Sequence, residues 1–371
     1  MSAYRFLISG GGTGGHVYPA IAIADAIKSI SPESTILFAG TRSKMEWIAV
    51  PQAGYDIKEI TISGIHRRFT LKNLFVPFKL VLSILQSRKI IKEFKPDAVI
   101  CTGGYVSGPV GWAAGRAGIP LFLQEQNSFP GLTTRKLAPH ASIIFTAFEA
   151  ARNYLPVSKI ILYGNPTRKE LRSGSAEKGL KAFGFSNKHK TLLVLGGSGG
   201  AKAINDAIAA NIKKLHYELG LQIVWQSGDR YLDTIKEVID PLSFERLRLF
   251  SFVNNMTDAY AAADIVLSRA GASICSELLV TGKPSVLVPS PNVAGDHQSK
   301  NAEEMVAKGA AALISDKDLS KQLVSTLKGL LDDKGKLETM SKAALEMAKP
   351  NAAEKISRKI FSVLENIRRA A

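Results

Sequence analysis

The stretch GGGTGGH, residues 10–16, contains five glycines and ends in a histidine. The apolar segment 4–9 precedes it, and the periodic segment YPAIAIADAIKSI, residues 18–30, follows it. This order predicts a β-strand, a tight turn and an α-helix, the unit that starts a doubly wound parallel sheet. Because glycine permits positive φ and close backbone approach, and a helix start attracts anions, such a turn is typical of a phosphate-binding loop.

The same order returns half a chain later, where TLLVLGGSGGAKAINDAIAANI occupies residues 191–212. The polar segment 163–175 between the two copies contains a proline and two glycines and is typical of a linker. We therefore expect an α/β protein with two Rossmann-like domains, at 1–165 and 166–350, whose parallel sheets face each other across a cleft. The basic amphipathic helix expected at 351–371 would pack back on the first domain. Short apolar runs predict strands at 5–9, 35–40, 97–104, 121–125, 142–147, 191–197, 222–228, 247–253, 264–268 and 285–289.

The composition is that of a basic globular protein. Of 371 residues, 48 are Lys or Arg and 32 are Asp or Glu, which gives a formal net charge of +16. Such a surface favours nucleic acid, anionic lipid or a phosphorylated substrate as the binding partner. The two cysteines, Cys101 and Cys275, exclude a disulfide framework, and no apolar run reaches the ~20 residues of a transmembrane helix.

The first glycine loop formally matches the dinucleotide fingerprint GxGxxG between residues 10 and 15. That fingerprint requires an acidic residue after the next strand, and the chain has Thr41 and Arg42 there, so a redox cofactor is disfavoured. Several loops of this kind, divided between two domains, indicate two phosphorylated ligands rather than one cofactor. Three further glycine loops follow expected strands, at 102–109, 196–201 and 268–273.

His16 lies where the first loop meets its helix, a position that favours a role as a base or a hydrogen-bond donor. A surface or structurally satisfied histidine is the plainer alternative. None of the six histidines pairs with another at a metal-ligand spacing. We therefore expect neither a metal ion nor a cofactor.

Seven motifs lie in order along nearly the whole chain: GGTGGHVYPA (11–20), GTRSKME (40–46), TGGYVSGP (102–109), EQN (125–127), GNP (164–166), GGSGGA (196–201) and the segment from SRAGASICSELLVTGKP (268–284) to DHQSKNA (296–302). Together they resemble the MurG family of bacterial glycosyltransferases, which add N-acetylglucosamine (GlcNAc) to lipid I and form lipid II for peptidoglycan. The resemblance implies a GT-B fold that needs no metal ion. It implies UDP-GlcNAc on the C-terminal domain and lipid I, the undecaprenyl-diphospho-muramoylpentapeptide, on the N-terminal domain.

The resemblance also implies which residues bind UDP-GlcNAc. The diphosphate would lie at Arg168, at Ser198 and at the helix start formed by 272–273, since helix starts bind anions. Glu277, one turn into that helix, would accept hydrogen bonds from the ribose hydroxyls, with a glutamate that serves only the helix dipole as the alternative. The full set is Thr13, Gly14, Gly15, Asn127 at the sugar, Arg168, Ser198, Val253 at the uracil, Ala272, Ser273, Glu277, and Gln298 at the GlcNAc hydroxyls.

Three positions depart from the pattern usual in the family. Gln124 stands where a histidine commonly precedes EQN, which removes a titratable group. Gly199 replaces a glutamine and Ala270 replaces a serine. These two changes remove polar side chains near the expected diphosphate without removing backbone donors.

The resemblance implies an inverting displacement, in which the C4 hydroxyl of the muramoyl sugar attacks the anomeric carbon of UDP-GlcNAc and forms a β-1,4 bond. His16 is the expected catalytic base, because a neutral imidazole accepts protons near pH 7. Glu125 is the second candidate, and a structural carboxylate satisfied by N–H groups is the alternative for it. The acceptor diphosphate is expected at Gly103, Gly104 and Tyr105.

Segment 66–95 carries eight basic residues against a single acidic one, interleaved with apolar residues at helical spacing. This pattern favours an anionic membrane surface, and a core-facing helix with solvated charges is the alternative. Because lipid I is anchored in the inner leaflet, the resemblance implies a peripheral protein on the cytoplasmic face of the bacterial inner membrane. Partners in cell-wall synthesis and division are implied in the same way.

Three other functions remain as alternatives. Another GT-B enzyme, such as a glycolipid synthase or a UDP-GlcNAc 2-epimerase, is disfavoured by GGYVSGP and EQN. A nucleic-acid-binding protein would need aromatic-rich basic strands or a recognition helix, and only 8% of residues are aromatic, so no nucleic acid is expected. An NADP-dependent oxidoreductase has Arg42 as its supporting residue.

Overall fold

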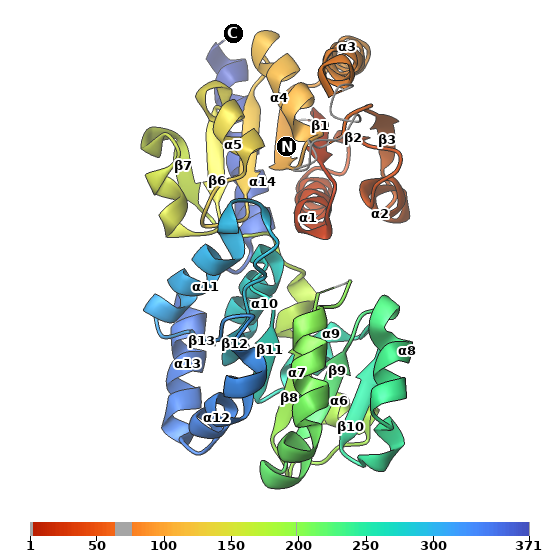
Figure 1. The fold of residues 1–371 in the computed structure, drawn as a ribbon. Helices are drawn as coiled ribbons and strands as arrows, with labels where there is room; N and C mark the ends of the chain where they lie inside the picture. Colours follow the sequence, from red (N-terminus) through yellow and green to blue (C-terminus); the bar gives the residue numbers. More distant parts are fainter. Residues whose placement is uncertain (1–2, 64–75, 198, 371) are drawn as a thin grey trace. The chain divides into compact units, whose positions relative to one another are not determined.

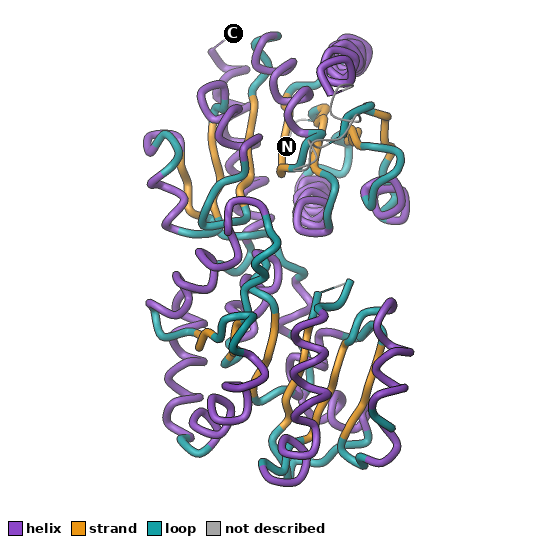
Figure 2. Tube along the Cα trace, viewed as in Figure 1, coloured by secondary structure: helices purple, strands orange, loops and turns teal. Residues whose placement is uncertain are grey.

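The computed structural model describes residues 3–63, 76–197 and 199–370, which form two compact units (Figure 1). Unit 1 comprises the chain up to Thr167 together with the part from Pro350 onward, and unit 2 comprises Arg168–Lys349. The boundaries between the units lie after residues 167 and 349, within two residues of the boundaries expected after 165 and 350. The prediction of two Rossmann-like domains is confirmed, because each unit contains a parallel sheet between helices (Figure 2).

The described part of unit 1 contains a seven-stranded sheet and six longer helices. Its strands are β1 (Arg5–Gly10), β2 (Thr35–Gly40), β3 (Asp56–Glu59), β4 (Ala98–Gly103), β5 (Leu121–Glu125), β6 (Ile143–Thr146) and β7 (Ile160–Leu162). Its helices are α1 (Gly14–Ile30), α2 (Glu46–Gln52), α3 (Val76–Phe94), α4 (Ser107–Arg116), α5 (Leu132–Leu137) and α14 (Ala352–Ala370), with short helical turns at Ala138–His140, Glu149–Asn153 and Val157–Lys159.

The sheet of unit 1 has the strand order β3-β2-β1-β4-β5-β6-β7, and its two faces bury different helices. Phe6 and Ile8 of β1 lie in one apolar cluster with side chains of α1, α2 and α14. Leu7, between them, lies in a second cluster with side chains of α3, α4 and α5. This alternation follows from the period of two in a strand. The last helix therefore completes the core of the unit that contains the start of the chain.

The described part of unit 2 contains a six-stranded sheet in the order β10-β9-β8-β11-β12-β13. Its strands are β8 (Thr191–Leu195), β9 (Gln222–Gln226), β10 (Leu247–Phe250), β11 (Ile265–Ser268), β12 (Ser285–Leu287) and β13 (Ala311–Leu313). Its helices are α6 (Ala176–Phe183), α7 (Lys202–Lys213), α8 (Asp229–Val238), α9 (Met256–Ala262), α10 (Ala272–Thr281), α11 (His297–Ala307), α12 (Leu319–Leu331) and α13 (Lys334–Met347), with short helical turns at Lys169–Arg172, Lys214–Glu218, Pro241–Ser243 and Ala294–Asp296. One face of the sheet packs on α7, α8 and α12 around the buried Trp225.

Three strands are absent from the sequence prediction, and all three lie at sheet edges. β3 reads DIKE and has charged, largely exposed side chains, which protect an edge strand from pairing with other chains. β7 and β13 have three residues each, which is too short for a recognisable alternation of apolar and polar residues.

In each sheet the order in which successive strands are added reverses at one place. This place lies between β1 and β4 in unit 1 and between β8 and β11 in unit 2. Connections from two such neighbouring strands leave toward opposite faces, and doubly wound sheets bind their ligands in the crevice at these carboxyl ends. The four glycine loops follow these four strands. The fold therefore brings the loops together in pairs, one pair in each unit.

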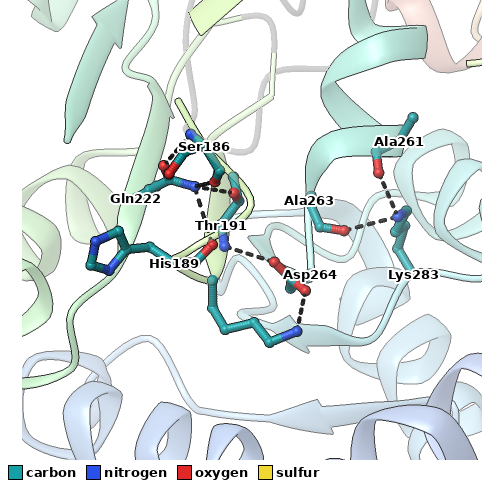
Figure 3. A network of polar contacts seen from close by, with 9 residues as sticks. Ser186, His189, Thr191, Gln222, Ala261, Ala263, Asp264 and Lys283 are labelled. Carbon is teal, nitrogen blue, oxygen red and sulfur yellow. Dashed lines mark hydrogen bonds and ion pairs between the residues drawn. The ribbon is translucent and has the colours of Figure 1, made fainter. Parts of the chain in front are cut away.

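At the opposite ends of the strands of unit 2, polar side chains hold the sheet together (Figure 3). Asp264, just before β11, accepts hydrogen bonds from the N–H of Thr191 at 2.8 Å and from Nζ of Lys190 at 2.6 Å. Gln222 of β9 donates to the hydroxyl of Thr191 and to two carbonyls of the preceding loop. Lys283 donates to two carbonyls at the end of α9, and burial lowers the pKa of its ammonium group. This network is a scaffold distant from the glycine loops along the strands.

Both cysteines are free and buried, Cys101 in β4 and Cys275 in α10. Burial raises the pKa of each thiol to about 12. Because the thiolate is the reactive form of cysteine, these side chains are inert packing residues at neutral pH.

Asp264→Ala is expected to lower the free energy of unfolding by about 2 kcal/mol, because it leaves the buried N–H of Thr191 without its acceptor. The matched control is Glu93→Ala, which breaks the exposed Lys89–Glu93 pair and is expected to change stability by less than about 0.5 kcal/mol. Urea denaturation of both variants measures the difference. Equal effects would contradict a structural role for the Asp264 network.

Candidate active site

The two glycine loops of unit 1 press directly against each other. A Cβ atom on Gly104 would collide with the carbonyl oxygen of Gly11. At Gly103, where φ is +107°, a Cβ would lie 2.7 Å from Nδ1 of His16. Contacts within the chain therefore suffice to explain why these positions carry no side chain. Gly12 differs, because its φ is +86° and a Cβ there would meet nothing within 4 Å.

Glu46, the first residue of α2, holds the first glycine loop. Its carboxylate is buried and accepts hydrogen bonds from the N–H groups of Gly12 at 2.9 Å and of Thr41 at 3.0 Å. An anion of the chain itself thus pairs with one of the loop N–H groups. The sequence analysis included Glu46 in the motif GTRSKME without a role, since 34 residues separate it from Gly12.

His16 lies in the first turn of α1, and Thr102 at the end of β4 holds it on two sides. The Thr102 hydroxyl donates to the His16 carbonyl at 2.8 Å, and the Thr102 carbonyl oxygen lies 3.1 Å from Nδ1 of His16. Oε1 of Gln126 lies 2.9 Å from the same nitrogen. The sequence analysis did not assign a role to either Thr102 or Gln126, although both belong to quoted motifs.

Glu125, the second candidate base, is a buried carboxylate bonded to its own loop. Oε1 accepts from the N–H of Asn127 at 3.0 Å and from its side-chain amide at 3.1 Å. Oε2 accepts from the N–H of Gly131 at 3.1 Å. These bonds favour the structural alternative for Glu125, in which it orders the loop that carries Asn127.

The remaining expected residues of unit 1 lie at the rim of these loops. Thr13 is exposed and precedes α1 in an extended conformation, and Gly14 and Gly15 begin the helix. Tyr105 is also exposed. The N-terminal turn of α1 therefore presents backbone N–H groups and small residues, as anion binding requires.

Unit 2 contains a pocket of about 500 Å³ at the carboxyl ends of its strands, within the size range of small-molecule sites. Its lining combines the third glycine loop with charged and amide side chains, among them Gly196, Gly200, Lys202, Arg269, Ser290 and Gln298. Oε1 of Gln298 accepts from the N–H of Ser290 at 2.9 Å. Ser198 lies outside the described residues.

Arg269, directly after β11, ties the ends of neighbouring strands together. Its Nη1 donates to the carbonyls of Val288 at 3.1 Å and Pro289 at 3.3 Å and pairs with the carboxylate of Asp316. The sequence analysis assigned Arg269 no role. Because Asp316 neutralises its charge, Arg269 stabilises the wall of the pocket and is not an unpaired cation.

The start of α10 is an open helix terminus. Gly271 precedes it in an extended conformation, and a Cβ there would meet nothing within 4 Å. Ala272 and Ser273 form the first turn, and Oγ of Ser273 is buried with no hydrogen-bond partner among the described residues. An open N-terminus with an unpaired hydroxyl suits an anionic ligand.

Glu277 lies one turn further along α10, held by Tyr260 and Arg168. The hydroxyl of Tyr260 donates to Oε2 at 2.9 Å, and Nη2 of Arg168 lies 3.6 Å from Oε1. Burial raises the pKa of the Glu277 carboxyl, while Arg168 and Tyr260 act in the opposite direction. The partly buried carboxylate, which has two side-chain partners, thus differs from a surface glutamate at a helix start.

Gln226, at the end of β9, connects two expected contact points. Its Oε1 accepts from the N–H of Val253 at 2.9 Å, and its Nε2 donates to the carbonyl of Gly197 at 3.1 Å. A uracil contact through the N–H of Val253 would compete with this bond. Gln226 lies in none of the seven motifs, so its contacts could not be predicted from the sequence.

In residues 3–63, 76–197 and 199–370, no three His, Cys, Asp or Glu side chains lie together so that they could hold a metal ion.

Two alanine substitutions separate backbone strain from steric contact. Gly12→Ala and Gly103→Ala both place a side chain at positive φ, which costs on the order of 1 kcal/mol. Only at Gly103 does the new Cβ also meet His16, so Gly103→Ala is expected to lower the thermal midpoint more than Gly12→Ala. Differential scanning calorimetry measures both, and a larger loss in Gly12→Ala would contradict the packing of His16 on Gly103.

Glu277→Gln is expected to stabilise the ligand-free protein increasingly as pH rises. The raised pKa means that the folded state disfavours the carboxylate, so wild-type stability falls as pH rises through the folded-state pKa. The glutamine carries no such charge. Urea denaturation of both proteins between about pH 4.5 and 8 measures the difference in unfolding free energy. If the difference in unfolding free energy shrank as pH rose, the raised pKa of Glu277 would be contradicted.

Family models match both units. Residues 6–146 match the glycosyltransferase family 28 N-terminal domain, and residues 191–356 match the glycosyltransferase family 28 C-terminal domain.

Curated relatives match over nearly the whole chain. A Flavobacterium psychrophilum protein described as UDP-N-acetylglucosamine--N-acetylmuramyl-(pentapeptide) pyrophosphoryl-undecaprenol N-acetylglucosamine transferase is 46% identical over 99% of this chain and 99% of its own. A protein of the same description from Salinibacter ruber is 44% identical over 99% of this chain and 98% of its own.

Solved structures agree with this assignment. The crystal structure of Acinetobacter baumannii MurG superimposes with a TM-score of 0.79 at 28% identity, covering 97% of this chain and 100% of that one. UDP-GlcNAc 2-epimerase from Neisseria meningitidis gives a TM-score of 0.68 at 16% identity over 96% of this chain and 99% of its own, a likeness of fold alone. The chain has the GT-B fold and belongs to glycosyltransferase family 28, within the MurG family of N-acetylglucosaminyltransferases.

Proposed function

We propose that this protein transfers GlcNAc from UDP-GlcNAc to the C4 hydroxyl of the muramoyl sugar of lipid I, with formation of lipid II. Near-full-length identity to relatives described as transferases of this kind supports the substrates. The observation that carries the proposal within the structure is the start of α10, where an open helix terminus lies one turn from the partly buried carboxylate of Glu277. In UDP-GlcNAc a diphosphate, which suits the helix start, is joined to a ribose diol, which suits the carboxylate.

Unit 2 is the proposed donor site. The diphosphate binds the N–H groups of Ala272 and Ser273, and the Ser273 hydroxyl gains the partner that it otherwise lacks among the described residues. Glu277 accepts from the ribose hydroxyls, since a carboxylate repels phosphate but binds a diol. Arg168, whose side chain is 56% exposed, neutralises the departing UDP. Val253 and Gln298 complete the site at the uracil and at the GlcNAc hydroxyls, and Ser198 joins the diphosphate donors.

Unit 1 is the proposed acceptor site and supplies the base. The diphosphate of lipid I binds at Gly103, Gly104 and Tyr105, beside the start of α1. His16 takes the proton from the C4 hydroxyl as its oxygen forms the bond to the anomeric carbon. The bond from that carbon to the diphosphate oxygen breaks, and UDP leaves with the electron pair. A single displacement of this kind inverts the α-linked sugar to a β-1,4 product.

The proposal also assigns Thr13, Gly14, Gly15 and Asn127 to the donor sugar. Thr13 is exposed at the start of α1. Glu125 holds the Asn127 loop in place of acting as the base, because its oxygens already accept from Asn127 and Gly131.

A membrane surface is the proposed partner of α3. From 78 to 87 this helix differs from an ordinary core helix: Ser83 and Ser87 are buried, whereas five apolar side chains are exposed, namely Phe78, Leu80, Val81, Leu82 and Leu85. Ile90 and Ile91, nearer its end, lie in the core. An exposed apolar stripe flanked by basic residues suits an anionic bilayer, where lipid I is anchored. Residues 66–75 of the expected membrane segment lie outside the described residues, so the evidence for this surface comes from 77–95. No helix in the described part of the chain is long and apolar enough to cross a membrane.

Peripheral attachment to the cytoplasmic face of the inner membrane follows from this proposal. Contacts with other cell-wall synthesis and division proteins are proposed from the family membership alone.

Two substitutions separate catalysis from donor binding in an assay of acceptor-dependent UDP release. His16→Ala is expected to lower kcat by ~100-fold or more with little change in KM for UDP-GlcNAc. Glu277→Gln is expected to weaken UDP binding by ~10-fold, the value of hydrogen bonds to a charged group. His140→Ala and Glu237→Gln, exposed residues of the same types, serve as controls. Equal losses of kcat and UDP affinity in His16→Ala would remove the base assignment, and UDP release without acceptor would indicate a hydrolysing epimerase.

Membrane binding is tested by sedimentation with anionic vesicles. The wild type is expected to bind less as salt rises, since charge attraction is screened. Phe78→Gln with Leu85→Gln is expected to reduce binding while turnover of a soluble lipid I analogue persists. Leu242→Gln, at a side chain that is 92% exposed in unit 2, is the control. Vesicle binding unaffected by the α3 changes would contradict the proposed surface.

A further inference from the structure

We propose that Gln126 is a positioning residue that fixes the tautomer of His16, with the proton on Nδ1 and the lone pair on Nε2. The inference rests on the proposed function for its catalytic meaning, because it explains how His16 is kept ready as a base. The tautomer itself follows from hydrogen bonds in unit 1 alone.

The orientation of the Gln126 amide has a single arrangement compatible with its neighbours. Its Nε2 faces three oxygens: the carbonyl of Thr102 at 2.6 Å, the carbonyl of Gln124 at 3.1 Å, and Oε1 of Gln124. Rotating the amide by half a turn would place its oxygen against these three acceptors. The side chain is buried, so water does not relieve that repulsion. Oε1 of Gln126 must therefore point toward His16.

That orientation determines which nitrogen of His16 carries the proton. Nδ1 lies 2.9 Å from Oε1 of Gln126 and 3.1 Å from the carbonyl oxygen of Thr102. Neither oxygen has a hydrogen to donate, so a bond to either requires a proton on Nδ1. In the neutral ring Nε2 is then unprotonated, and it alone is able to accept the proton of an attacking hydroxyl. The opposite tautomer would present an N–H to the hydroxyl and leave Nδ1 against two acceptors.

Backbone packing supports the same geometry. The ring lies so close to Gly103 that a Cβ there would be 2.7 Å from Nδ1. The Thr102 hydroxyl holds the His16 carbonyl at 2.8 Å. When Nε2 takes up the substrate proton, the Nδ1–H bonds remain in place, and the charged ring keeps both acceptors. The proton transfer therefore needs no rearrangement of the ring.

The structure shows what Gln124 contacts at the position where the family commonly has a histidine. Besides accepting from Gln126, its amide donates through Nε2 to Oδ1 of Asn165 at 3.3 Å. Both Gln124 and Asn165 are buried. A chain of amides thus runs from Asn165 through Gln124 to Gln126 and ends at His16, and it orients Gln126 without a titratable group at position 124.

The first test is a two-bond ¹⁵N–¹H correlation spectrum of the full chain labelled at histidine, recorded at neutral pH, with His16 assigned by comparison with His16→Gln. The ¹⁵N shifts distinguish a protonated ring nitrogen from an unprotonated one. The expected result is a protonated Nδ1 and an unprotonated Nε2. A proton on Nε2 in the wild type would overturn the proposal, whatever the activity.

The second test replaces the amide with a side chain of similar length that neither accepts nor orients. Gln126→Met leaves the Thr102 carbonyl as an acceptor for Nδ1, so the other tautomer is expected to gain population without replacing the first. The variant is expected to lower kcat by about tenfold with little change in KM for UDP-GlcNAc. Gln222→Met, the control, removes an equally buried and equally bonded amide from unit 2 (Figure 3). It is expected to lower the urea midpoint while the His16 signals and kcat stay unchanged.

Two results would overturn the positioning role: a Gln126→Met protein with the wild-type tautomer and kcat, or equal effects of the two methionine variants on kcat. Failure of the proposed function is distinguishable, because the wild-type protein would then show the expected tautomer and no transfer to lipid I.

Discussion

The constraint on which the rest depends is the reversal of strand order in each parallel sheet. At β1 and β4, and again at β8 and β11, neighbouring strands send their connections to opposite faces, and a crevice remains at their carboxyl ends. Each strand must turn at once into a helix at this place. The glycine loops meet that demand, and the helix starts that follow them supply unpaired N–H groups.

These loops are held mostly by the chain itself. Gly104 packs on Gly11, Gly103 on His16, and the carboxylate of Glu46 takes the N–H of Gly12. In unit 2, Gln226 and Arg269 brace the corresponding loops. Such internal bonds fix the loop shape before a ligand arrives, which is what an electrostatic site requires. The start of α10 differs, because Gly271 faces open space and Ser273 has an unpaired hydroxyl within the described residues.

Glu277 is a charged group of this region whose ionised form the folded state disfavours. Its carboxylate is partly buried in the ligand-free protein, where loss of solvent raises its pKa and Arg168 and Tyr260 compensate only partly. A carboxylate whose charge the folded state disfavours is a candidate functional group, which supports the proposed role of Glu277.

Much of the fold was predictable, because strands such as β2 contain a continuous apolar run, here 36–39, and because the strand, glycine loop and helix at the start of the chain return half a chain later. The edge strands β3, β7 and β13 could not be predicted, because they are short or polar and become strands only by pairing with a neighbour.

A motif is enough to select a candidate residue, as at His16 and Glu277, whose roles stay predictions. Gln126, Gln226 and Glu46 were missed because their roles arise from contacts across many residues, such as the 110 that separate Gln126 from His16. The absence of side chains at 103 and 104 was attributed to a ligand, and packing within the chain explains it without one.

The measurement that tests the central claim most directly is the anomeric configuration of the product formed from UDP-GlcNAc and a soluble analogue of lipid I. Proton coupling at the new glycosidic carbon distinguishes the two anomers. A single displacement assisted by His16 predicts a β-1,4-linked disaccharide and one UDP per product. An α-linked product would contradict direct displacement and the role of His16 as its base.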